Sequence, residues 1–479
     1  MKEYDVITIG TGAASSVLHG MLQQNPHLRA AIIDKDAPGG ICLTRGCIPS
    51  KLLLYPAELV RTVERAHEFG IDATVRKIRF ADIMVRMRRM IGEDIESIRK
   101  ELSETPGLDY YPTIAEFVAP YTLQVGAETI HAPLLLLGLG SEVVVPPIPG
   151  LRETGFLTSD TLLQLTELPE SVAVIGGGYI AAEYGSFLAA MGARVTILGR
   201  NERFLPDEEP EISETIERVL SRHLTISTGH KVTRVAPGRR GRKLVTFEDR
   251  SGGTEDQLEA REILVASGRG PTTGLLHPER AGIAVDPHGW VVTNDRLETS
   301  QKGVYALGDA NGRFLFRHKA NWEAHTIFTN LVEGGNSRVD YRAVPHAVFT
   351  EPEIAAVGLG EAEAIERLGA ANIRIGHYRY ADTARGQSIG DHDGFVKVIL
   401  EHPSTKILGA HIIGPQAAIL LQEIVDLMYT AEGTTGPILR GMHIHPALSE
   451  VVDRAVRYPT TVEEYRRLRS PPPAAPGPH

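Results

Sequence analysis

The chain opens with a repeating pattern in which a short apolar run is followed by a glycine turn and a helical stretch. The first apolar run, the glycine turn and a second apolar run fill positions 6–9, 10–15 and 30–33. The same order returns at positions 172–175, 176–181 and 194–198. Short apolar runs bounded by turn residues are typical of buried parallel strands. The pattern therefore predicts two βαβ units, the folding units of dinucleotide-binding domains.

Other patterns predict the elements around these units. Positions 80–102 carry apolar residues at helical spacing and predict an amphipathic helix. The helical stretch 52–69 contains Pro56, which predicts a kink or two helical pieces. Further strands are predicted at 134–140, 263–266 and 303–307, and a proline-rich domain boundary is predicted at 143–150. Beyond residue 343, alternating strands and one long apolar helix at 417–429 indicate an α+β domain.

Composition narrows the class of protein. The 479 residues are 42% apolar and include 48 glycines, which suits an α/β enzyme of several domains. The net charge of -10 argues against nucleic acid as the main partner, since phosphate binding needs a basic surface. The first residues lack the pattern of a signal peptide, and no apolar run is long enough to span a membrane. We therefore expect a cytoplasmic protein with no membrane or nucleic-acid partner.

The first glycine turn has the features of a phosphate-binding loop. Gly10 permits a tight turn, Gly12 lets the backbone approach a pyrophosphate, and the following helix N-terminus stabilises negative charge. Asp34 ends the second strand, where a carboxylate accepts hydrogen bonds from ribose hydroxyls. Ser15 at the third glycine position leaves an ordinary strand-to-helix turn as the alternative. The flanking strand, helix and acid favour the dinucleotide site.

The second glycine turn, with Gly176 and Gly178, predicts a second dinucleotide. Where NAD-binding folds usually carry an acid, the chain has Gly199 followed by Arg200, with Arg203 nearby. Loss of the acid and gain of cations favour the 2′-phosphate of NADP. The alternative is that these arginines are surface residues and that NAD is bound through other contacts.

The only two cysteines, Cys42 and Cys47, lie close together in a glycine-flanked segment. Pro49 can occupy the first turn of a helix that begins just after Cys47, which would aim a helix N-terminus at a sulfur and favour the thiolate. The alternatives are a structural disulfide or a buried pair of thiols. A lone structural disulfide is disfavoured without a secretion signal, and two sulfurs without a nearby histidine fall short of a zinc site. We therefore predict a redox-active dithiol and no metal.

His445 and Glu450 form a candidate acid–base pair. Pro446 keeps His445 out of helical geometry, so its ring can project from a helix start while Glu450 reaches back to one ring nitrogen. A carboxylate in this position fixes the tautomer and raises the basicity of the ring. The alternative, which must hold for most of the 18 histidines, is a packed or surface residue.

These motifs, in this order, resemble the flavin-dependent pyridine nucleotide-disulfide oxidoreductases over the chain up to about Tyr458. The resemblance implies FAD at the first glycine turn and NAD or NADP at the second. It implies that Cys47 lies against the flavin, that Cys42 exchanges with substrate, and that Lys51 lies beside the flavin with Glu183 as its partner. Asp309 matches the acid that holds the ribityl chain of the flavin. The full implied set of cofactor-binding residues is Gly10, Gly12, Ala13, Ala14, Asp34, Gly40, Lys51, Gly140, Asp309, Gly176, Gly178, Tyr179, Ile180, Arg200, Arg203 and Gly268.

The implied fold is α/β, with two Rossmann-like dinucleotide-binding domains and a C-terminal α+β dimerisation domain. The domains would be 1–149 with 278–340 for FAD, 150–277 for NAD(P), 341–462 for the interface, and a disordered tail at 463–479. The resemblance also implies a homodimer in which His445 and Glu450 serve the active site of the other subunit.

The expected activity is dithiol–disulfide exchange coupled to NAD(P). The form His443-x-His445-Pro446 resembles that of dihydrolipoamide dehydrogenases, which makes lipoamide, as a small molecule or on a lipoyl domain, the expected substrate. Mycothione reductases are the rival, because positions 348–358 and Ala447 resemble theirs. The tail lacks the cysteine pair of mercuric reductases, and the disulfide-binding arginines of glutathione reductases cannot be placed. A non-catalytic flavin redox sensor or complex subunit is the alternative from another class.

Some residues depart from the family pattern. Arg45 stands between the two cysteines where a small apolar residue is common, and such a cation could depress a thiol pKa or attract an acidic substrate. Leu139 and Ser267 replace threonines of the usual Ala-Thr-Gly turns. Gly199 and Arg200 replace the acid expected of an NAD-using lipoamide enzyme, which leaves an NADPH-linked direction or a different substrate.

Overall fold

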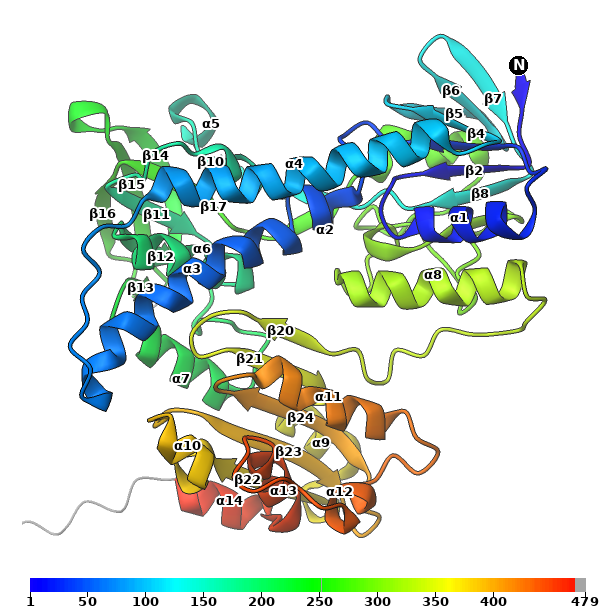
Figure 1. Ribbon diagram of the computed structural model, residues 1–479. Helices are drawn as coiled ribbons and strands as arrows, with labels where there is room; N and C mark the ends of the chain where they lie inside the picture. Colours follow the sequence, from blue (N-terminus) through cyan, green and yellow to red (C-terminus); the bar gives the residue numbers. More distant parts are fainter. Residues whose placement is uncertain (251, 470–479) are drawn as a thin grey trace, which may run out of the picture. The chain divides into compact units, whose positions relative to one another are not determined.

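The computed structural model describes residues 1–250 and 252–469 (Figure 1). The chain divides into two compact units. Unit 1 comprises residues 1–63, 74–198 and 231–341, and unit 2 comprises residues 64–73, 199–230 and the chain from 342 onward. Both predicted βαβ motifs lie in unit 1 and the predicted α+β region lies in unit 2, whereas the division into three domains remains a prediction.

A five-stranded parallel sheet forms the first nucleotide-binding part of unit 1. Its strands follow the order β19 (Val304–Ala306), β8 (Leu134–Leu137), β2 (Val6–Ile9), β3 (Ala30–Ile33) and β4 (Leu108–Tyr111). Helices α1 (Ala14–Gln24) and α8 (Arg317–Leu331) cover one face through buried residues such as Leu18 and Ile327. The opposite face packs against a second sheet, in the order β1 (Lys2–Glu3), β7 (Glu128–His131), β6 (Thr122–Val125) and β5 (Ala115–Ala119). The predicted strands 6–9 and 30–33 are confirmed.

A second parallel sheet in unit 1 carries the second glycine turn. Within unit 1 its strands follow the order β10 (Leu157–Thr158), β17 (Glu262–Val265), β11 (Ser171–Ile175) and β12 (Arg194–Leu198). Helix α6 (Tyr179–Met191) packs on this sheet with most of its residues buried. A three-stranded sheet of β14 (His230–Pro237), β15 (Lys243–Asp249) and β16 (Glu255–Ala260) shares the core on the other side. The second predicted βαβ unit is therefore confirmed.

Residues 39–47, which contain both cysteines, are called the redox loop. Two long helices begin at its end and beyond it. Helix α3 (Cys47–Arg65) is continuous through Pro56, and a short 3-10 helix, η1 (Ala66–Phe69), follows it. The predicted division into two helical pieces at Pro56 is therefore wrong, whereas the predicted kink stays a prediction. Leu53 and Ala57 are buried beside the proline, and their packing offsets the one backbone hydrogen bond that proline removes. Helix α4 (Phe80–Glu104) confirms the predicted amphipathic helix. Over residues 1–250 and 252–469, no helix is both long and apolar enough to span a membrane.

Unit 2 is built on an antiparallel six-stranded sheet, which confirms the α+β prediction. Its strands follow the order β20 (His346–Val348), β21 (Ile354–Gly358), β24 (Ile407–Ile413), β23 (Phe395–Glu401), β22 (Ile373–Arg379) and β25 (Thr460–Thr461). Helices α11 (Ala417–Met428) and α13 (Glu450–Arg457) pack against it and form the apolar core of the unit. Helix α7 (Pro210–Leu220) contacts β24.

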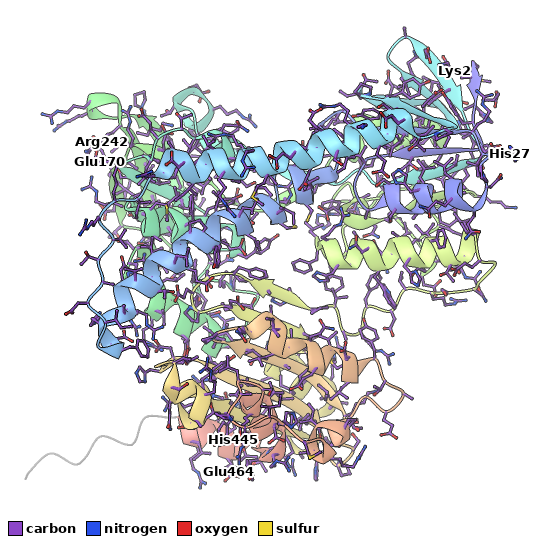
Figure 2. The ribbon with its side chains drawn as sticks, in the orientation of Figure 1. Lys2, His27, Glu170, Arg242, His445 and Glu464 are labelled. Carbon is purple, nitrogen blue, oxygen red and sulfur yellow. The ribbon has the colours of Figure 1, made fainter. Side chains whose placement is uncertain are left out.

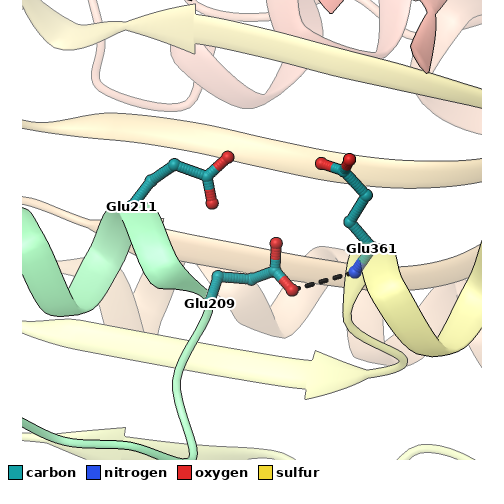
Figure 3. A group of neighbouring side chains, drawn as sticks. All are labelled: Glu209, Glu211 and Glu361. Carbon is teal, nitrogen blue, oxygen red and sulfur yellow. Dashed lines mark hydrogen bonds between the residues drawn. The ribbon is translucent and has the colours of Figure 1, made fainter. Parts of the chain in front are cut away.

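A buried ionic cluster lies in unit 2 where α7 begins. Three carboxylates, from Glu209, Glu211 and Glu361, lie close enough together to suggest a metal site (Figure 3). The ammonium group of Lys397 on β23 occupies their centre, with its Nζ 2.5, 3.0 and 2.7 Å from an oxygen of each carboxylate in that order. Lys397 is fully buried, so this internal cation neutralises part of the cluster and takes the place that a metal would need.

The predicted disordered tail begins too early in the sequence. Residues 462–469 form helix α14 (Val462–Arg469), whose Tyr465 is buried and donates a hydrogen bond of 2.8 Å to Glu211. Arg466 pairs with Glu361 at 2.8 Å. These apolar and charged contacts hold the helix in place. The composition of the proline-rich tail contains no information about them. The rest of the predicted tail, residues 470–479, lies outside the described residues.

Candidate functional site

The two cysteines lie at the junction of two helices in unit 1. Cys42 belongs to the short helix α2 (Gly40–Thr44), and Cys47 is the first residue of α3. Both are free thiols, with Cys42 half-buried and Cys47 exposed, and a hydrogen bond joins their side chains. The two thiols are therefore in contact.

The hydrogen bond shifts the pKa values of the two thiols in opposite directions. The bond from Cys47 is the largest cause that lowers the pKa of Cys42 from 9.0 to about 7; burial opposes it, and the positive charges of Arg317 and Lys51 add to it. The same bond raises the pKa of Cys47. The pair therefore holds one thiolate near neutral pH, and that thiolate is the nucleophile in disulfide exchange.

Arg317, the first residue of α8, is a contributor that sequence reasoning missed. It lies far from the cysteines along the chain and belongs to no motif, so no local signal could have identified it. By contrast, Arg45, the predicted modulator of the thiols, directs its guanidinium to Asp36 and Asp160. The structure therefore does not support the hypothesis that Arg45 depresses a thiol pKa.

Lys51 and Glu183 form the ion pair that the resemblance implies. Lys51, one turn into α3, places its Nζ 2.8 and 2.9 Å from the two carboxylate oxygens of Glu183 on α6. Glu183 is 5% exposed, so its charge is held in the protein interior by this pair. The pair joins the helix that follows the cysteines to the helix of the second glycine turn.

The first glycine turn fits a dinucleotide. Gly10 has φ +100°, and a Cβ atom there would lie 2.1 Å from the carbonyl oxygen of Gly138, so only glycine fits this turn. The carboxylate of Asp34 accepts hydrogen bonds from the backbone and hydroxyl of Thr11, at 2.8 and 2.6 Å. The other implied residues lie on the turn, at the starts of α1 and α2, and after β8; they are Gly12, Ala13, Ala14, Gly40 and Gly140.

Asp309 lies in the 3-10 helix η6 (Gly308–Asn311) just after β19. Its carboxylate accepts a hydrogen bond of 2.6 Å from Ser141, and Ser141 accepts one of 2.8 Å from Arg269. This short polar chain fixes the orientation of the carboxylate that the resemblance assigns to the ribityl chain of FAD.

A buried ion pair beneath Asp309 was not predicted. Lys319 and Glu323 on α8 are fully buried and 3.2 Å apart. Lys319 donates to the carbonyl of Gly308, and Glu323 accepts from the amide of Gly308, at 2.8 and 2.7 Å. A lysine and a glutamate four residues apart indicate an ion pair on a helix, but such pairs more often lie on the solvent-exposed face, so the sequence did not show that this pair is buried.

The second glycine turn fits a dinucleotide as well. Gly176 has φ +136°, and a Cβ atom there would lie 2.1 Å from the carbonyl oxygen of Ala266. Gly178 precedes α6, Tyr179 and Ile180 begin it, and a Cβ atom on Gly178 or Gly268 would meet no protein atom within 4 Å. A backbone turn with open space at a helix N-terminus suits a pyrophosphate.

Arg200 and Arg203 belong to unit 2, whereas the second glycine turn belongs to unit 1. Both arginines are exposed. Their proposed contact with a 2′-phosphate therefore remains a prediction.

In unit 2, His445 (labelled in Figure 2) has the carboxylate partner that its motif predicts. Its Nδ1 lies 3.0 and 3.1 Å from the two oxygens of Glu450, the first residue of α13. The hydrogen bond with His445 lowers the pKa of Glu450. The His445 side chain is 70% exposed, and its second nitrogen, Nε2, is the atom left for proton transfer.

Comparison with known proteins identifies the family. The pyridine nucleotide-disulphide oxidoreductase model matches residues 4–324, and the dimerisation-domain model of the same family matches residues 344–456. The chain belongs to the pyridine nucleotide-disulphide oxidoreductases. These enzymes are flavin-dependent, use FAD and NAD(P)H, and act on sulfur groups. The dimerisation domain indicates a homodimer.

Several relatives span almost the whole chain. A mycothione reductase of Mycobacterium tuberculosis is 36% identical, with 95% of this chain and 99% of the relative covered. A mitochondrial dihydrolipoyl dehydrogenase of Pisum sativum is 31% identical, with 95% and 91% covered. Among solved structures, the HOCl-induced flavoprotein disulfide reductase RclA from Escherichia coli is 29% identical with a TM-score of 0.84, and 95% and 99% of the two chains are covered.

Proposed function

We propose that this enzyme passes two electrons between NAD(P)(H) and a substrate dithiol or disulfide through Cys42 and Cys47, with dihydrolipoamide and lipoamide as the substrate pair. The observation that carries the proposal is the hydrogen-bonded thiol pair, in which the pKa of Cys42 is lowered to about 7. A group with such a pKa is partly ionised at neutral pH and so is ready for disulfide exchange.

The chain's own residues account for the sulfur chemistry. FAD at the first glycine turn and NAD(P)H at the second supply two electrons when bound. Two electrons and two protons open the Cys42–Cys47 disulfide to two thiols. The Cys42 thiolate attacks one sulfur of a substrate disulfide and releases one substrate thiol. Cys47 then attacks the Cys42 sulfur, re-forms the internal disulfide and releases the second substrate thiol.

His445 is the proposed acid–base catalyst of this exchange. Glu450 binds Nδ1 and orients the ring, so Nε2 can protonate the departing substrate thiolate and accept the proton again in the reverse direction. The dimerisation domain supports a further part of the proposal, in which His445 and Glu450 act at the active site of the partner subunit.

Two observations favour a second candidate substrate, mycothione. The relative named mycothione reductase is 36% identical over 95% of the chain. In addition, Gly199 and Arg200 replace the acid typical of NAD-using enzymes, which favours NADPH and a reductive direction.

The test is a comparison of kcat/KM for lipoamide, mycothione and glutathione disulfide, each with NADH and with NADPH. We expect lipoamide to exceed the other two disulfides by at least tenfold. A preference for mycothione with NADPH would support the second candidate. If no disulfide is turned over while the nicotinamide still reduces the flavin, the protein is a redox sensor or complex subunit and the proposal is wrong.

A further inference from the structure

Arg45 links the loop between the two cysteines to two other segments of unit 1. It directly follows helix α2, as the C-cap residue, and its side chain is 23% exposed. Its Nη2 lies 2.5 Å from Asp36, which precedes the loop. Its Nε lies 3.3 Å from Asp160, which precedes the 3-10 helix η2 (Thr161–Gln164). One guanidinium therefore connects the redox loop to the segment before it, through Asp36, and to the segment before η2, through Asp160.

The contacts continue beyond Asp160. Its other carboxylate oxygen lies 3.8 Å from Arg269, whose side chain is 10% exposed. Arg269 donates to the hydroxyl and the carbonyl of Ser141 at 2.8 and 2.7 Å, and Ser141 donates to Asp309 at 2.6 Å. A line of alternating charges thus runs from the redox loop to the carboxylate at the end of β19.

The charges on this line exclude a simple electrostatic role for Arg45. Two carboxylates face its single positive charge, and Arg269 balances the second of them. Burial opposes ionisation of Asp36, but Lys35 and Arg45 together hold the pKa of its carboxyl below the usual value. The Arg45 charge is therefore already neutralised by its neighbours and has little field left for the sulfurs.

The loop needs contacts with other segments to fix its conformation, because its own secondary structure is too short to be stable. Helix α2 has five residues, which is too short to be stable alone. Gly39 before it and Gly40, its first residue, both have positive φ, and Gly46 lies beyond its end, so the backbone on both sides has few restraints. A disulfide forms only when the two Cα atoms and the S–S dihedral angle fall in a narrow range.

We propose that Arg45 is a positioning residue, which holds the short helix between the thiols in the geometry that allows Cys42 and Cys47 to close into a disulfide. The inference rests on the proposed function, because it assumes that the pair opens and closes.

The test measures the dithiol–disulfide equilibrium of Cys42 and Cys47 in dithiothreitol redox buffers, with alkylation and mass spectrometry to count free thiols. We expect Arg45→Met to shift the equilibrium about tenfold toward the open dithiol, the combined effect of two partly exposed ion pairs. Tenfold corresponds to ~30 mV for a two-electron couple. Asp160→Asn should shift it in the same direction by about threefold.

The direction of the two shifts separates positioning from charge. If Arg45 acted through its charge, removing it would disfavour the thiolate, whereas removing the Asp160 charge would favour it, so the two variants would shift in opposite directions. Opposite shifts, or an Arg45→Met value within twofold of the wild type, would overturn the inference. The matched control is Arg89→Met, which breaks an exposed ion pair with Glu93 on α4 and should leave the equilibrium unchanged.

Two further measurements keep the result interpretable. FAD content and melting temperature show whether the variants fold; if Arg45→Met does not, the single variants Asp160→Asn and Asp36→Asn carry the test, and no shift toward the dithiol in either would overturn the inference. If the wild-type cysteines do not equilibrate with dithiothreitol at all, the proposed function fails rather than the role of Arg45.

Discussion

Replacing Cys47 with alanine should make Cys42 markedly less acidic. The hydrogen bond from the Cys47 thiol is the largest cause that lowers the pKa of Cys42 from 9.0 to about 7. Cys47→Ala removes this donor and leaves Arg317 and Lys51 in place. We expect the pKa to rise by more than one unit toward its ordinary value, because burial then opposes the thiolate while the two cations still favour it.

The size of the effect follows from the ionised fraction. A thiol with a pKa of about 7 is half ionised at pH 7. A thiol with a pKa of 8 to 9 is only about 1 to 10% ionised at that pH. The rate of alkylation by iodoacetamide at pH 7 should therefore fall by roughly five- to fifty-fold. At pH 10 both proteins are ionised and their rates should converge.

The assay is the pH profile of iodoacetamide alkylation, followed on the Cys42 peptide by mass spectrometry. The variant has a single cysteine, so the curve has one transition and its midpoint is the pKa of Cys42. Arg317→Met in the same background should raise the midpoint further, by a smaller amount, because its charge is a smaller cause than the hydrogen bond. A midpoint that stays near 7 in Cys47→Ala would refute the reasoning, since the hydrogen bond would then not control the acidity.

Three other changes test separate parts of the structure. Cys42→Ser should abolish disulfide turnover and leave FAD bound, as measured by steady-state assay and flavin absorbance; retained turnover would contradict the proposed function. His445→Ala should slow the exchange half-reaction by roughly 10² to 10⁴-fold in stopped-flow experiments, and a change of a few-fold would remove it from acid–base catalysis. Burial lowers the pKa of His377 from 6.5 to about 4, so it stabilises the fold above pH 6.5 and this contribution is lost as pH falls toward 4. His377→Phe should remove up to about 3 kcal/mol of this pH dependence in urea unfolding at pH 7 and pH 4.5, and an unchanged dependence would contradict the assignment.

The sequence predicted elements whose cause is local. The strands at 6–9 and 30–33 are short apolar runs bounded by turn residues, and both are buried parallel strands in the structure. The amphipathic helix α4 follows its apolar spacing. The contact between His445 and Glu450 is also local, because Glu450 begins α13 only five residues after His445.

The features that sequence reasoning missed arise from packing between distant segments. Pro56 lies inside a continuous helix because Leu53 and Ala57 beside it are buried. Lys397 is charged and fully buried because Glu209 and Glu361, from two other elements, surround it. A rule based on composition or periodicity considers one segment at a time and does not include contacts between distant segments.

The two arginines near the active site show why position in the sequence is a poor guide to electrostatics. Arg45 lies between the cysteines in the chain, yet its charge is directed to Asp36 and Asp160. Arg317 lies far away in the chain, yet its charge lowers the pKa of Cys42 because α8 begins close to the thiol. Coulomb energy depends on distance in space and on nearby counter-charges, neither of which a motif contains. The fold therefore brings in a charge that adds to the effect of the Cys47 hydrogen bond on the acidity of Cys42, while the arginine between the cysteines is free to hold the loop in place.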